Sequence, residues 1–65
     1  MSVGQRIRAL RKLKGITASS MSEKLDIHVV YYRALEAGTK SISPSMGTRI
    51  ASILGTSYHE LKQEG

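Results

Sequence analysis

The sequence contains no cysteine, which excludes disulfide bonds and thiolate metal sites. No apolar run approaches the ~18–20 residues of a membrane span, and the N-terminus lacks the apolar segment of a signal peptide. From these absences we expect a protein of a reducing, cytoplasmic compartment and no membrane partner.

Acidic residues are also scarce, and the positive charge is concentrated near the N-terminus. Ten Lys and Arg residues stand against five Asp and Glu, which gives a formal net charge of +5. The basic residues that precede the first acid, Glu23, are Arg6, Arg8, Arg11, Lys12 and Lys14. A basic end of this kind favours a polyanionic partner, but a solvated helix face has the same pattern, so charge alone leaves both interpretations open.

Hydrophobic spacing predicts one all-α domain over residues 1–65, a compact arrangement of five helices without strands. Ser2 and Gln5 have the spacing of a capping box, and they predict a first helix from Val3 to about Lys14. Gly15 is expected to end this helix, whose inward-facing residues are predicted to be Ile7, Leu10 and Leu13.

Two short helices joined by a tight turn are predicted next, the first over about 18–25 and the second over about 29–37. Thr17 can cap the first of them, and Asp26, which tolerates the left-handed conformation, stands where it must end. Gly38 offers the second helix a C-terminal stop. Such a pair forms a helix-turn-helix motif, which places its second helix in a DNA major groove.

A small polar loop over residues 38–43 separates this motif from two further predicted helices. Pro44 suits the first turn of a helix that Gly55 ends. Ser57 and Glu60 have the spacing of a second capping box, which predicts a short last helix.

The order of several segments resembles the lambdoid phage repressor and Cro family of helix-turn-helix DNA-binding domains. These segments are the block that ends at Arg11, then Leu35-Glu36-Ala37-Gly38, a short loop with Pro44, and Ile50-Ala51 through Leu54-Gly55. The similarity covers nearly the whole chain. It implies a lambda-repressor-like domain that dimerises on a double-stranded DNA operator and regulates transcription, and we expect a repressor.

The resemblance also implies which residues contact DNA. In the family, the second helix of the motif reads bases, while the start of the first helix and the loop after the second hold phosphates. The positions that match in this chain are Thr17, Ala18, Ser19, His28, Val29, Val30, Tyr31, Arg33, Ala34, Thr39, Lys40 and Ser41. Because the family often has Gln at the position of Ala18, we expect weaker phosphate anchoring at that point.

The base-reading positions are mostly apolar, and two hypotheses follow. In the first, Val29 and Val30 pack on thymine methyl groups, Tyr31 bonds a phosphate or base, and Arg33 contacts a phosphate or a guanine. In the second, Val29, Val30 and Tyr31 form an interface for a partner protein, as in an antitoxin-like or co-regulator module. Binding to random duplex DNA at low salt distinguishes them.

The resemblance places a homodimer contact at the start of the last helix and in the segment before the fourth. The residues expected there are Ile42, Pro44, Met46, Tyr58 and Glu60. Tyr58 is the expected anchor, because it is aromatic with a polar tip. The alternative is that its ring packs on its own domain.

The remaining polar and aromatic candidates have mainly structural interpretations. Arg11 and Glu36 match a family ion pair that joins the first helix to the end of the recognition helix. Tyr32 is expected in the core, and His28 at a helix start. Since His28 and His59 lie on separate elements, no metal site is expected. No nucleophile with a neighbouring base and no phosphate-binding glycine loop is present, so we expect neither an enzyme nor a cofactor or small-molecule ligand.

Overall fold

A computed structural model describes residues 2–63, and it contains five helices in chain order. Their bounds are α1 Val3–Leu13, α2 Ala18–Leu25, α3 Val29–Ala37, α4 Pro44–Leu54 and α5 Tyr58–Lys62. No strand occurs in this part of the chain. The all-α prediction is confirmed, and the predicted end of α1 is one residue too late.

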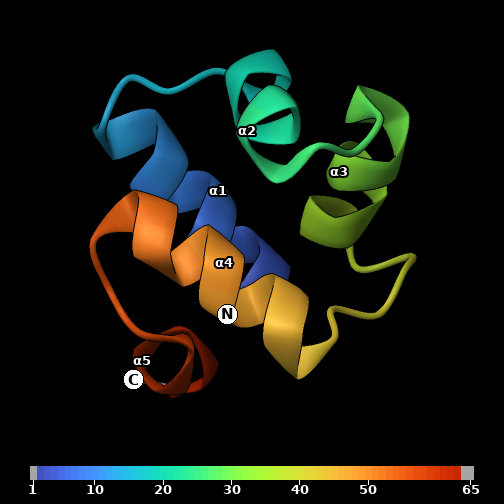
Figure 1. Cartoon of the computed structure of the whole chain (residues 1–65). Coiled ribbons are helices and arrows are strands. Elements are labelled where there is room, and N and C mark those ends of the chain that lie inside the picture. The colour runs from blue at the N-terminus through green and yellow to red at the C-terminus, as the bar shows by residue number, and fades with distance from the viewer. Residues whose placement is uncertain (1, 64–65) are drawn as a thin grey trace.

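The helix-turn-helix pair α2 and α3 lies at one end of the molecule, and α5 lies at the other (Figure 1). Between them, α1 and α4 lie side by side, and α1 contacts α3, α4 and α5 while α2 contacts α3 and α4. The first helix therefore holds both ends of the fold together. No helix within residues 2–63 has the length and apolar character needed to cross a membrane.

All five helices contribute to a single hydrophobic core. Its buried members are Ile7 of α1, Met21 and Leu25 of α2, Tyr32 and Leu35 of α3, Ile50, Ala51 and Leu54 of α4, and Leu61 of α5. The prediction that Tyr32 lies in the core is confirmed. Because residues from every helix meet here, the orientation of α3 is set by the same packing that stabilises the domain.

The helix ends are fixed by short-range hydrogen bonds. The Thr17 hydroxyl accepts from the Ser20 backbone N–H at 3.0 Å and begins α2. Asp26 ends α2 with φ 58° and ψ 45°, as predicted for a residue that tolerates the left-handed region. Gly38 ends α3 in the same region at φ 84°. The turn between α2 and α3 is thus short, and its geometry is dictated by neighbouring residues.

Two sequence predictions were wrong. Leu13 is 82% exposed, because six residues at 100° each place it about 120° around the helix from buried Ile7. The second capping box is only half formed. The Ser57 hydroxyl accepts from the Glu60 N–H at 3.1 Å, but the Glu60 carboxylate accepts instead from the Thr56 hydroxyl at 3.0 Å.

Two glycines allow close approaches that no larger residue would permit. A Cβ atom on Gly4 of α1 would collide with the backbone carbonyl groups of Leu35 and Glu36 at the end of α3. A Cβ atom on Gly47 of α4 would collide with the Tyr58 ring. Gly4 therefore sets the distance between α1 and α3.

Candidate nucleic-acid interface

The site is built around a buried ion pair between α1 and α3. Arg11 Nε donates to Glu36 Oε2 at 2.7 Å, and Arg11 Nη2 donates to Glu36 Oε1 at 3.1 Å. A third bond runs from Arg11 Nη1 to the Ile16 carbonyl oxygen at 2.9 Å. Both residues are buried, with 8% and 9% of their surfaces exposed. The bidentate pair thus joins α1, the segment before α2, and the end of α3.

The surroundings favour the ionised form of Glu36. Burial is the largest single influence on the pKa of this carboxyl and opposes its ionisation. The hydrogen bonds from Arg11, the neighbouring Tyr32 hydroxyl and the positive charges of Arg11 and Arg8 together outweigh burial and hold the pKa below its usual value. Burial, followed by the nearby Glu36 carboxylate, raises the pKa of the Tyr32 hydroxyl. That hydroxyl is fully buried and meets no hydrogen-bond partner in suitable geometry among residues 2–63. Tyr32 therefore packs beside the ion pair without being bonded to it.

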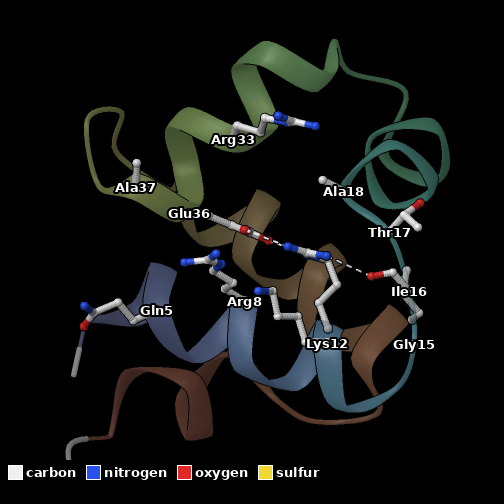
Figure 2. Close-up of a pocket in the computed structure, with 11 residues that line it drawn as sticks. Gln5, Arg8, Lys12, Gly15, Ile16, Thr17, Ala18, Arg33, Glu36 and Ala37 are labelled. Atoms are coloured by element: carbon white, nitrogen blue, oxygen red, sulfur yellow. Dashed lines mark hydrogen bonds and ion pairs between the residues drawn. The ribbon is translucent and has the colours of Figure 1, made fainter.

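A basic cavity of about 710 Å³ opens beside this ion pair. Its charged lining residues are Arg8, Arg11 and Lys12 of α1 and Arg33 and Glu36 of α3 (Figure 2). Only Arg11 is paired with a carboxylate among the described residues, so four cations against one carboxylate leave an excess of positive charge. Such a concave basic surface attracts anions.

The start of α2 adds backbone donors to the same cavity. Thr17 and Ala18 line it, and the first backbone bond of α2 runs from Met21 N to Thr17 O. The N–H groups of Ala18 and Ser19 precede that bond, so they have no acceptor within the helix. Of these two residues, Ala18 lines the cavity, and its methyl group supplies no acceptor of its own. The free N–H donors at the start of α2 and the cationic side chains of the cavity can together bind a phosphate group.

Arg33 illustrates what the fold adds to the sequence. Its side chain extends from α3 toward Thr17 and Ala18 at the start of α2 (Figure 2). This position favours the phosphate alternative for Arg33 over a guanine contact.

Arg8 and Lys12 were missing from the predicted set. Their spacing of four residues on a helix, within a basic run, was the available signal that they share one face.

The outward face of α3 carries few polar groups. Val30 is 67% exposed, and Ala34 and Ala37 follow it at helical spacing on the same face. Tyr31, at 40% exposure, flanks this face on one side, and Arg33 flanks it on the other. Val29 is half-buried, so it presents less surface than Val30. The helix that the motif would offer to DNA is mainly a surface of methyl groups.

The two ends of α3 also bring predicted residues to the surface. His28 caps the helix, and its Nδ1 accepts from the Val30 N–H at 3.1 Å, which leaves Nε2 as the outward donor of the neutral ring. After α3, Thr39, Lys40 and Ser41 are all exposed. The Thr39 hydroxyl also donates to the Ala34 carbonyl at 3.4 Å. Lys40 is therefore the side chain of this loop best suited to a phosphate contact.

The residues predicted for a dimer contact lie partly against their own domain. The Tyr58 hydroxyl donates to the Ile42 carbonyl at 3.4 Å, and its ring packs on Gly47. Tyr58, Ile42 and Met46 are half-buried, whereas Pro44 and Glu60 are exposed. The fold thus brings Tyr58 next to Ile42 and onto α4, so its ring makes the intramolecular contact of the alternative hypothesis.

Comparison with known proteins agrees with this geometry. A search of curated proteins finds none that matches the chain. A family model described as helix-turn-helix matches residues 7–61, which span α2, α3, α4 and most of α1 and α5. The match covers well over half of the sequence and includes the whole motif. The chain therefore belongs to the Cro/C1-type helix-turn-helix family, whose members are DNA-binding transcription regulators.

Proposed function

We propose that this protein is a repressor that binds a specific double-stranded DNA operator as a homodimer, with α3 in the major groove. The observation that carries the proposal is the basic cavity at the start of α2, next to the exposed face of α3. A phosphate held in the cavity would fix the register of the domain on the duplex. The outward face of α3 would then meet the base edges.

Phosphates are held at both ends of the recognition helix in this proposal. Arg8, Lys12 and Arg33 supply the charge at the α2 side, and Lys40 supplies it at the loop side. These cavity cations supply the phosphate contact that a glutamine often makes in the family at the position of Ala18. Each phosphate contact releases condensed counterions, so binding to any duplex weakens steeply as salt rises.

The first test is binding to a random-sequence duplex, followed by fluorescence anisotropy across a salt series. Arg33→Ala and Lys40→Ala should each weaken binding to all sequences alike and reduce the slope of log K against log salt by about one. Lys62→Ala is the matched control, because Lys62 lies on α5 at the far end of the molecule (Figure 1). If the salt slope is unchanged in both Arg33→Ala and Lys40→Ala, neither residue contacts a DNA phosphate.

A homodimer follows from the small size of the reading surface. One short helix offers few base contacts, so useful specificity requires two copies on half-sites about one helical turn, ~34 Å, apart. Glu60→Ala tests the contact better than Tyr58→Ala, because Glu60 is exposed while Tyr58 packs on its own domain. We expect Glu60→Ala to reduce cooperative binding to two half-sites and to leave binding to one half-site unchanged. An equal loss of affinity for the two-half-site operator and for the single half-site would refute a dimer contact through Glu60.

One observation favours a second candidate function. Val30 and Tyr31 expose apolar surface that a partner protein could bury. If the protein binds no duplex DNA at low salt, the interaction module becomes the better explanation, since a DNA-binding domain with this charge must show nonspecific affinity.

A further inference from the structure

The chemistry of the exposed α3 face indicates which feature of DNA it can recognise. Val30, Ala34 and Ala37 lie one turn apart along one side of α3 and are called here the Val30 stripe. Val30 and Ala37 are exposed and Ala34 is half-buried, and Ala37 also lies at the edge of the basic cavity. None of these side chains carries a hydrogen-bond donor or acceptor. The stripe can therefore recognise apolar groups in the major groove, but it cannot recognise the donors and acceptors of base edges.

The polar side chains of α3 lie off this stripe. Arg33 extends into the cavity toward α2, and His28 uses its Nδ1 to cap the helix. Tyr31 lies about 100° around the helix from Val30. Direct contact at the centre of the interface is thus limited to methyl groups.

The apolar group that bases present in the major groove is the C5 methyl of thymine. A methyl on C5 of cytosine occupies the same place. The two bases differ at the neighbouring exocyclic group, where thymine has an oxygen acceptor and cytosine an amino donor. Because the Val30 stripe has no group that could bond either one, it lacks the means to distinguish them.

We propose that α3 recognises the C5 methyl group itself, so that 5-methylcytosine substitutes for thymine at the contacted steps. This inference rests on the proposed DNA-binding function and names the feature that its recognition helix reads. The expected order of affinities at a contacted step is thymine equal to 5-methylcytosine, then uracil equal to cytosine. A side chain that read hydrogen bonds would instead group thymine with uracil and cytosine with 5-methylcytosine.

The experiment starts from a half-site selected from a random pool of unmodified duplex. At each thymine of that site, duplexes are made with thymine, uracil, cytosine or 5-methylcytosine, and binding is measured by anisotropy. Burial of one methyl group predicts about fourfold weaker binding for uracil than for thymine. Cytosine should also bind about fourfold more weakly than 5-methylcytosine. These two comparisons keep the base pairing unchanged, so each isolates the methyl group.

Val30→Ser tests the assignment of this effect to the stripe. The side chain is exposed, so the variant should fold, and the ratio of thymine to uracil affinity should fall toward one. Leu13→Ser is the matched control, because Leu13 is also exposed but lies on α1 outside the interface. It should leave the ratio at its wild-type value.

The outcomes separate this inference from the proposed function. Equal binding of thymine and uracil, or of cytosine and 5-methylcytosine, at every position of the site overturns methyl recognition while DNA binding stands. A selection that yields no preferred sequence also overturns it, provided that binding to random duplex at low salt persists. Loss of that low-salt binding would instead refute the proposed function.

Discussion

Replacing Glu36 by glutamine keeps the shape of the side chain but removes its charge, and it leaves the Arg11 guanidinium without a countercharge. In the protein, two hydrogen bonds of 2.7 and 3.1 Å join these residues, and both residues are at least nine-tenths buried. Removing one member of a buried pair typically costs ~3–5 kcal/mol. Glutamine retains one acceptor oxygen, so we expect Glu36→Gln to cost about 3 kcal/mol.

This loss is large for a chain of 65 residues. At roughly 0.05–0.15 kcal/mol per residue, the whole domain has a free energy of unfolding of roughly 3–10 kcal/mol. Urea denaturation followed by circular dichroism would measure the change, with Glu23→Gln as an exposed control on α2. Arg11→Met combined with Glu36→Met should be less destabilising than Glu36→Gln, because no charge is then left buried.

The pH dependence provides an independent check. The Glu36 pKa is lower in the folded protein than its usual value of 4.5, so the unfolded state takes up the proton first as pH falls. The contribution of the pair is fully present above that usual value and is lost as pH falls through the folded-state pKa. The difference in free energy of unfolding between wild type and Glu36→Gln should therefore disappear in acid. Two results would show that the Arg11–Glu36 ion pair does not stabilise the fold in this way. One is a difference in free energy of unfolding below ~0.5 kcal/mol at neutral pH, and the other is a difference that stays the same in acid.

Three further substitutions probe the packing that positions α3. Tyr32→Phe removes a buried hydroxyl without a bonded partner, so it should leave the free energy of unfolding unchanged or raise it by ~1 kcal/mol; a clear loss in urea denaturation would show that the hydroxyl bonds Glu36. Gly4→Ala should destabilise the domain by several kcal/mol and lower its melting temperature, because its Cβ would meet backbone that cannot yield; a near-neutral effect would contradict the close approach of α1 and α3. Gly47→Ala should destabilise it too, but Tyr58→Ala should relieve part of that cost in a double-mutant cycle, whereas additive effects would contradict the ring contact.

Most of the fold could be predicted from the sequence because helix ends depend on residues close in the chain. The Thr17 and Ser43 hydroxyls cap N–H groups three residues later, and Gly38 and Gly55 end helices through their own backbone conformation. Such signals act within one turn of helix. They are visible without knowledge of the tertiary structure.

Parts of the candidate site depended on contacts across the fold. Arg33 was ambiguous until the tertiary structure placed it on the same cavity as Arg8 and Lys12, with its side chain directed toward the start of α2. Leu13 was wrongly placed inward: it lies three residues after Leu10, but about 120° around the helix from buried Ile7, and the partners of α1 do not cover that side. Local sequence therefore determined where the helices begin and end, whereas tertiary packing decided which faces meet and which charges gather around one cavity, because these contacts join residues far apart in the chain.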